Sequence, residues 1–236
     1  IVLNKADLAD EAATRAWVKY FAEQELVAVP VDAVKGRGIK ELVQAIAKCA
    51  KPKTDKLVQH GAKARAARCM ILGIPNVGKS SLINRLSGGT KTKVENRPGV
   101  TRAKQWIRLG AQLELLDMPG ILWPKFEDRQ AALHLAFTGA INDNVYDVAS
   151  VVLLLLNTLR EEYPADLVAR YRLEGDLPSG TELLEEIGRR RGCLRAGGKI
   201  DYEKAEQIVL TDFRSGRLGR VTLDAVPAFS DDGAAR

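Results

Sequence analysis

Cysteine and long hydrophobic runs are scarce in this sequence. Its 236 residues include three cysteines, Cys49, Cys69 and Cys193, and no two of them form a CxxC pair. Such isolated cysteines argue against a structural zinc site or a disulfide framework, and they indicate a reducing compartment. The longest apolar run, 151–156, is far too short to cross a bilayer. We therefore expect no membrane partner.

Aromatic residues are also few, at 6%, and there are two histidines. His60 is expected to be solvated and His134 to lie at the surface or in packing, rather than to activate water. The 36 basic and 30 acidic residues give a net charge of +6. This mild excess permits a nucleic-acid partner without requiring one. With 46% hydrophobic residues the chain is not disordered as a whole.

The first half of the chain alternates strand and helix patterns. Apolar segments at 1–3, 26–31, 69–72, 107–109 and 113–116 read as strands, and helical periods cover 9–25, 39–50 and 79–86. This alternation predicts an α/β domain with a mostly parallel sheet and helices on both faces. After about residue 140 the pattern is helical, with helices expected over 145–159, 181–191 and 202–214. We predict domains at 1–139 and 140–226 and a flexible tail at 227–236.

A phosphate-binding loop follows the strand at 69–72. The segment GIPNVGKS, 73–80, fits GxxxxGK[ST] between a strand and a helix. Its glycines let backbone N–H groups turn towards phosphate oxygens, Lys79 is expected to reach the β- and γ-phosphates, and Ser80 to bind Mg²⁺. The alternative is a glycine turn that binds nothing.

A base-reading motif, NKxD, comes directly after the first strand, at Asn4, Lys5 and Asp7. The Asp7 carboxylate can accept hydrogen bonds from both N1–H and the exocyclic amine of guanine. Adenine lacks this pair of donors, so the carboxylate would be left unpaired at a cost of roughly 1–3 kcal/mol. Read alone, the motif is weak, and Asp7 or Asp10 could instead cap a helix.

Two further segments fit the switch regions of a nucleotide hydrolase. Asp117-Met118-Pro119-Gly120 matches DxxG, with Asp117 holding Mg²⁺ through water and the Gly120 N–H facing the γ-phosphate. Thr101, in RPGVTR, is the candidate switch threonine. Ile121 occupies the position after DxxG where Ras-like enzymes carry a water-orienting glutamine, so slow intrinsic turnover is expected.

The order of these motifs is informative, because NKxD precedes the phosphate loop here and follows it in ordinary GTPases. With this order and the segments GIPNVGKS, RPGVTR and DMPGILWPKFED, the chain resembles the circularly permuted ribosome biogenesis GTPase A (RbgA/YlqF) family over essentially its whole length. The resemblance implies a P-loop GTPase domain, a helical domain that contacts ribosomal RNA, and a GTPase acting in assembly of the large ribosomal subunit.

The resemblance also implies a set of site residues. Catalytic roles fall to Lys79, Thr101 and Gly120. Guanine nucleotide would be bound by Asn4, Lys5, Asp7, Ala33 (through its backbone), Gly73, Asn76, Val77, Gly78, Lys79, Ser80, Ser81, Thr101 and Gly120. Metal ligands would be Ser80, Thr101 and Asp117 for Mg²⁺ and Asn76 for K⁺. Asp32 stands where the family commonly has serine.

A permuted GTPase sheet needs one more strand between the strands at 69–72 and 1–3, and we expect it upstream of residue 1. The protein is expected to be monomeric and cytoplasmic, with an organellar homologue as the alternative location. A nucleotide-dependent binding switch with negligible turnover is the alternative function. The scattered cysteines argue against the small-subunit type of permuted GTPase, which carries a Cys/His zinc motif.

Basic residues cluster at 189–191, with Arg195 and Lys199, and again over 51–68. Either cluster could hold RNA phosphates. The segment 176–224 nevertheless contains nine basic and nine acidic residues. The charge of this segment therefore favours a solvated helix surface. Only the family resemblance favours an RNA-binding surface.

Overall fold

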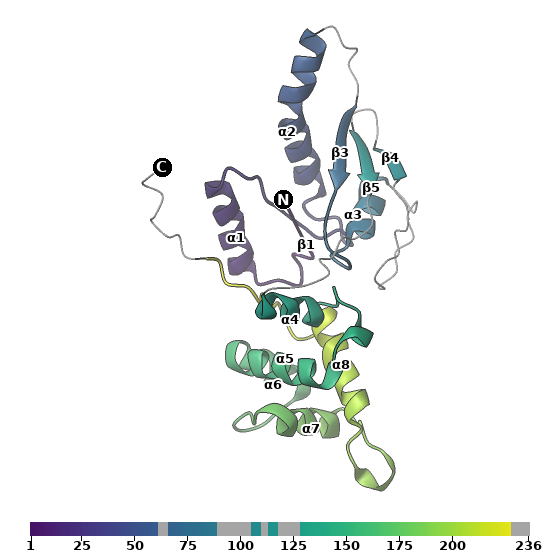
Figure 1. Ribbon diagram of the computed structural model, residues 1–236. Helices are drawn as coiled ribbons and strands as arrows, with labels where there is room; N and C mark the ends of the chain where they lie inside the picture. The colour runs from purple at the N-terminus through teal and green to yellow at the C-terminus, as the bar shows by residue number, and fades with distance from the viewer. Residues whose placement is uncertain (61–65, 89–104, 110–112, 118–127, 228–236) are drawn as a thin grey trace.

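The computed structural model describes residues 1–60, 66–88, 105–109, 113–117 and 128–227. Thr101, Gly120, Ile121 and nearly all of the expected tail lie outside these residues. The chain forms an α/β part, in the upper half of Figure 1, and a helical part, in the lower half. None of the helices in the described ranges is both long and apolar enough to span a bilayer.

The α/β part follows the predicted alternation. Its elements are β1 (Val2–Asn4), α1 (Glu11–Glu23), β2 (Val29–Val31), α2 (Ile39–Gln59), β3 (Ala67–Ile71), α3 (Lys79–Leu86), β4 (Gln105–Leu109) and β5 (Leu113–Asp117). β1 pairs in parallel with β2, and β3 pairs in parallel with β5. β4 lies antiparallel on the other edge of β5. Two of the three strand pairings are therefore parallel, as predicted, and one is antiparallel.

Helix α2 is longer than the sequence pattern predicts. The prediction ended it at residue 50, before Pro52, but the helix continues through this proline to Gln59. Proline lacks the N–H of one helical hydrogen bond, which disfavours but does not forbid an interior position. Two residues after Pro52, the Thr54 hydroxyl donates to the Lys51 carbonyl at 2.9 Å.

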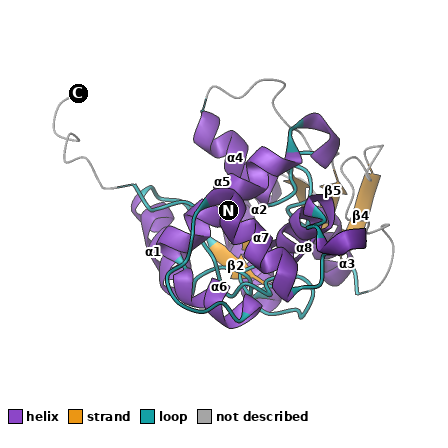
Figure 2. Ribbon diagram, turned by 90° about the horizontal axis from the view of Figure 1, so that it is seen from below, coloured by secondary structure: helices purple, strands orange, loops and turns teal. Residues whose placement is uncertain are grey.

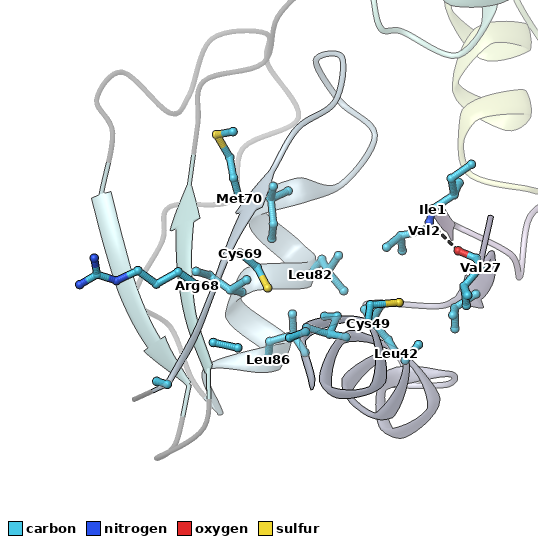
Figure 3. Close-up of a pocket in the computed structure, with 18 of the residues that line it drawn as sticks. Ile1, Val2, Val27, Leu42, Cys49, Arg68, Cys69, Met70, Leu82 and Leu86 are labelled. Carbon is cyan, nitrogen blue, oxygen red and sulfur yellow. Dashed lines mark hydrogen bonds between the residues drawn. The ribbon is translucent and has the colours of Figure 1, made fainter. Parts of the chain in front are cut away.

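The described strands form two separate sheets, β1–β2 and β3–β5–β4. A largely apolar cavity of about 490 Å³ lies between them. Figure 3 shows Ile1, Val2 and Val27 on one side of it, and Cys69 and Met70 on the other. Residues that a continuous sheet would cover are exposed, Met70 to 52% and Ile1 to 49%. The expected further strand between β1 and β3 stays a prediction.

The helical part is organised around α5. Its elements are α4 (Arg129–Phe137), the 3₁₀ turn η1 (Asp143–Val145), α5 (Val148–Glu162), α6 (Pro164–Tyr171), α7 (Gly180–Arg190), the 3₁₀ turn η2 (Ala196–Gly198) and α8 (Tyr202–Arg214). The Asp147 carboxylate caps α5 by accepting from the Ser150 N–H at 3.2 Å. The core of this part already includes Ala136 and Phe137 of α4, so helical packing begins before residue 140.

The end of the described chain returns to the α/β part. Beyond α8, the Val221 N–H donates to the Leu8 carbonyl at 3.0 Å, and the Asp10 N–H donates to Thr222 Oγ1 at 3.1 Å. In Figure 1 this yellow segment runs up towards α1. Seen from below, α1 and β4 lie at opposite sides of the molecule (Figure 2). The helical part is therefore fixed to the α1 side by the chain that follows it.

The α5 core gives a direct test of the packing. Leu155→Ala is expected to lower the free energy of unfolding by about 2–5 kcal/mol, because Leu155 is fully buried and its loss leaves a cavity. The matched control is Leu154→Ala, one residue away and 44% exposed, which should change stability by less than about 0.5 kcal/mol. Chemical denaturation followed by circular dichroism measures both, and equal losses would contradict this packing.

Candidate functional site

One side chain joins the base-reading motif to the phosphate loop. Asn4 Nδ2 donates a hydrogen bond to the Val77 carbonyl at 2.8 Å. On its other side, Asn4 Oδ1 accepts from the Ala33 N–H at 3.3 Å. Three segments far apart in sequence therefore meet at Asn4. A Cβ at Gly78 would collide with Asn4 Nδ2, and Gly78 has φ +90°, so this position requires glycine.

The phosphate loop has the backbone that an anion site needs. Asn76 and Gly78 have positive φ angles of 57° and 90°, and α3 begins immediately afterwards at Lys79. Lys79 Nζ donates to the Gly73 and Ile74 carbonyls at 2.8 and 2.7 Å. The ammonium thus lies over its own loop, at the N-terminus of a helix, where a phosphate would be attracted. Ser80 and Ser81 follow in the first turn of α3.

The loop after β2 is shaped by a buried carboxylate. Asp32 is 3% exposed, and its Oδ1 accepts from the Val34 and Lys35 N–H groups at 3.0 and 2.9 Å. Arg85 of α3 donates to the Ala33 carbonyl at 3.0 Å and also to the Val34 carbonyl. The backbone at Ala33 is consequently held against the helix that follows the phosphate loop. An aspartate at position 32 is therefore compatible with this turn.

The carboxylate of Asp7 remains partly accessible, with its side chain 21% exposed. Lys35 Nζ lies 3.6 Å from Asp7 Oδ2 and 4.0 Å from Asp32 Oδ2. This lysine balances negative charge in the loop. Asp7 follows Asn4 by three residues in the chain, and the Ala33 N–H donates a hydrogen bond to Asn4. Both groups expected to bind the base are thus connected to Asn4.

Lys5 lies where the two parts of the molecule meet. It has a left-handed backbone, with φ 58°. Burial, and then the charge of Arg214, lower the Lys5 pKa, while Asp7 acts in the opposite direction. Arg214 is held in place by the Asp143 carboxylate, at 2.8 and 3.0 Å, and by the Phe137 carbonyl at 3.0 Å. The base-reading motif therefore faces a fixed cation of α8.

A cavity of about 720 Å³ opens between these segments. Asn4, Lys5, Asn76 and Lys79 line it together with residues of the chain after α4, including Thr138. The facing strand segments 1–3 and 70–72 line it as well, so the cavity extends into the space between the two sheets, while Asp7, Ala33 and Ser80 do not line it. A further contact crosses this boundary, since Asn76 Nδ2 donates to the Gly139 carbonyl at 2.5 Å.

The position of Asp117 follows from the register of strand β5 on strand β3. Asp117 ends β5 directly opposite Ile71 of β3, and Ile71 lies two residues before Gly73. The candidate Mg²⁺ residue is thus at the edge of the sheet where the phosphate loop begins. Carboxylate and hydroxyl oxygens, the donor types of Asp117 and Ser80, are suited to Mg²⁺.

Several residues of the site were not found from the sequence. Arg85, Lys35 and Arg214 have no motif around them, and each acts through a contact with a distant segment. His134 is not part of the site: its Nδ1 lies 2.7 Å from Asp224 Oδ1, and its ring packs near Phe137. Those contacts agree with the expected packing role.

Comparisons with known proteins point in one direction. The profile of the 50S ribosome-binding GTPase family matches residues 68–175. The chain is 46% identical to "Ribosome biogenesis GTPase A" of Bacillus cereus over 98% of this chain and 78% of that protein. It is 32% identical to mouse "Mitochondrial ribosome-associated GTPase 1" over 95% of this chain and 74% of that one.

Solved structures give the same result. The GNP-bound crystal structure of YlqF from T. maritima has a TM-score of 0.62 and 28% sequence identity, with 95% of this chain and 80% of that chain covered. A GDP-bound YlqF structure reaches a TM-score of 0.65 with 27% identity, covering 95% of this chain and 82% of that one.

The hydrogen bonds of Asn4 can be tested without a ligand. Asn4→Ala removes the donor to Val77 and the acceptor for Ala33, and we expect the free energy of unfolding to fall by about 1–3 kcal/mol. Asn144→Ala, at an exposed position of η1, is the matched control and should be nearly neutral. Denaturant titration compares them, and equal stabilities would show that Asn4 does not tie the segments together.

Proposed function

The chain belongs to the ribosome biogenesis GTPase A family, whose members are GTP-hydrolysing assembly factors of the ribosome, and we propose that its target is the large ribosomal subunit. Nucleotide state would switch its binding to the subunit and to ribosomal RNA. The observation that supports the proposal is the Asn4–Val77 hydrogen bond, which joins the NKxD segment to the segment 73–80 that fits a phosphate loop. The family description, a 50S ribosome-binding GTPase, supports the choice of subunit.

At the base end, Asp7 would accept from guanine N1–H and the exocyclic amine, the Lys5 stem would lie along the ring, and the Ala33 N–H would exchange Asn4 Oδ1 for the guanine carbonyl. The Asn4 amide would then act on the base edge as well as on the loop. Support comes from the accessible Asp7 carboxylate and from the fixed Ala33 backbone. Adenine would leave Asp7 without its donors.

At the phosphate end, the backbone of 73–80 and the N-terminus of α3 would hold the β- and γ-phosphates, with Gly73, Val77, Gly78 and Ser81 shaping the cradle. Lys79 would exchange its contacts with Gly73 and Ile74 for phosphate oxygens. Mg²⁺, when bound, neutralises phosphate charge. Ser80, Thr101 and Asp117 would hold it, and Thr101 and the Gly120 N–H would respond to the γ-phosphate.

K⁺ is proposed at Asn76. Its amide nitrogen is already used by the Gly139 carbonyl at 2.5 Å. Among the described residues, no hydrogen-bond donor contacts Asn76 Oδ1. An amide oxygen is a suitable ligand for a hard cation. A cation there would add positive charge beside the phosphates.

Ile121 supports low intrinsic turnover, because it offers no group that can orient water. The same residue favours one alternative, a binding switch with negligible hydrolysis. The protein would act as a monomer in the cytoplasm, or in an organelle if it is an organellar homologue.

The function is tested by sedimentation with purified large subunits in GTP analogue, GDP or no nucleotide. We expect binding to be strongest with the GTP analogue, and phosphate release to rise at least tenfold when subunits are added, because the partner completes the site. Lys79→Ala should abolish both nucleotide effects. Small-subunit binding, or large-subunit binding independent of nucleotide, would contradict the proposal, whereas switched binding without hydrolysis would select the alternative.

The K⁺ proposal makes a separate prediction. Wild-type turnover in K⁺ should exceed that in Na⁺ by roughly tenfold, because a correctly placed cation stabilises charge developing on the leaving phosphate. Asn76→Ala should turn over at similar low rates in both salts. Rates are measured by phosphate release at constant ionic strength, and equal wild-type rates would exclude this role for K⁺.

A further inference from the structure

The helical part contains a pocket of about 630 Å³ lined mainly by arginines. They come from the end of α6, the end of α7 and the chain after α8, segments that pack together in the lower half of Figure 1. We call this the arginine pocket; its arginines are Arg170, Arg172, Arg190, Arg191 and Arg217. Resting on the function proposed above, we propose that it binds backbone phosphates of RNA.

The floor of the pocket is a buried ion pair. Asp212 is 1% exposed and accepts two hydrogen bonds from Arg170, both at 2.8 Å, and one from Arg217 at 3.3 Å. Burial would raise the Asp212 pKa, but the hydrogen bonds and charge of Arg170 hold it below its ordinary value. Asp212 is therefore ionised at neutral pH, and its single charge is shared by two guanidinium groups. Positive charge remains in the pocket.

Two arginines of the pocket are available for a ligand. Within the described part of the chain, the side chains of Arg172 and Arg191 form neither an ion pair nor a hydrogen bond. Arg190 is partly occupied, at 3.3 Å from Glu174 and 3.6 Å from Glu186. Asp166 is the one acidic residue among the lining side chains. An anion entering the pocket would thus find two unpaired guanidinium groups.

Arg172 also has an unusual backbone. It caps the C-terminus of α6 with φ 56° and ψ 44°, the left-handed conformation usually taken by glycine. A side chain is disfavoured there. The sequence nevertheless places a guanidinium at this position, at the edge of the pocket, where it is exposed.

Tyr171 closes one wall of the pocket. It lines the pocket but is 2% exposed, and burial, and then the neighbouring Asp212 charge, raise its pKa, so the buried hydroxyl keeps its proton beside Asp212. The groups that an incoming phosphate meets are therefore the guanidinium forks of the arginines, which match its oxygens.

Other arginines nearby are neutralised inside the domain. Arg189 pairs with Glu185 at 2.8 Å, and Arg195 pairs with Asp201 at 3.0 Å. The run 189–191 therefore divides: Arg189 pairs on its own helix and does not line the pocket, Arg190 lines the pocket but has two acidic partners, and Arg191 lines it unpaired among the described residues. This division singles out the arginine pocket, rather than the whole basic run, as the RNA contact.

The test measures the affinity of the full chain for a labelled RNA hairpin by fluorescence anisotropy over a salt series. Arg172→Gln combined with Arg191→Gln should weaken binding roughly tenfold or more and reduce the slope of log K against log salt by about two, one for each lost phosphate contact. Arg172→Gly should weaken binding several-fold while keeping the fold, because glycine suits the left-handed backbone.

The matched control is Arg189→Gln combined with Arg195→Gln, which removes the same number of guanidinium groups outside the pocket. It should leave RNA affinity within about twofold of wild type. Thermal unfolding of every variant confirms folding. Equal effects of pocket and control variants, an unchanged salt slope, or no hairpin binding by the wild type would each overturn the proposal.

Sedimentation with large subunits separates the two proposals. If wild-type and pocket variants bind subunits equally in GTP analogue, the arginine pocket is not the contact and the proposed function stands. If wild type does not bind subunits, the function fails, and the hairpin measurement still decides the pocket. Loss of subunit binding with unchanged RNA affinity would assign the pocket to an acidic protein surface and overturn the RNA proposal.

Discussion

The site depends on one short polar side chain that bonds on both sides. A guanine nucleotide has its base at one end and its phosphates at the other, so the segments that read each end must be fixed relative to one another. Asn4 ties the candidate segments for the two ends together by donating to Val77 in the phosphate loop and accepting from Ala33 in the loop after β2. Gly78 makes the approach possible because it has no Cβ to collide with the amide. Arg85 adds a second tie between the same two regions.

The helical part meets the α/β part at this same place. Asn76 of the phosphate loop bonds to Gly139, and Lys5 of the base motif faces Arg214 at the end of α8. Arg214 is itself anchored by Asp143 and the Phe137 carbonyl. A change in the phosphate loop therefore has a direct physical route to the helices, through the segment after α4. The permuted order of the motifs makes this route short, since the chain passes from DxxG into α4.

Charge in the helical part is distributed by tertiary contacts and not by composition. Equal numbers of acidic and basic residues over 176–224 give no net patch. The fold pairs some arginines within their own segments, as at Arg189 and Arg195, and gathers others around Asp212. One buried carboxylate cannot neutralise all the guanidinium groups around it. Residues that average to neutrality along the sequence thus produce a basic pocket in space.

The sequence by itself determined the α/β class, the helical second half and the four candidate nucleotide motifs with their permuted order, because periodicity and motif spacing are local properties of the chain. It did not predict helix α6. Only the tertiary structure decided that Asn4 contacts Val77, that α2 continues through Pro52, and that Arg170, Arg191 and Arg217 share one pocket. The Asn4 contact and the pocket depend on distances between residues far apart in sequence, which no local pattern encodes. The course of α2 through Pro52 runs against the local preference of proline, which lowers helix propensity but does not by itself fix where a helix ends.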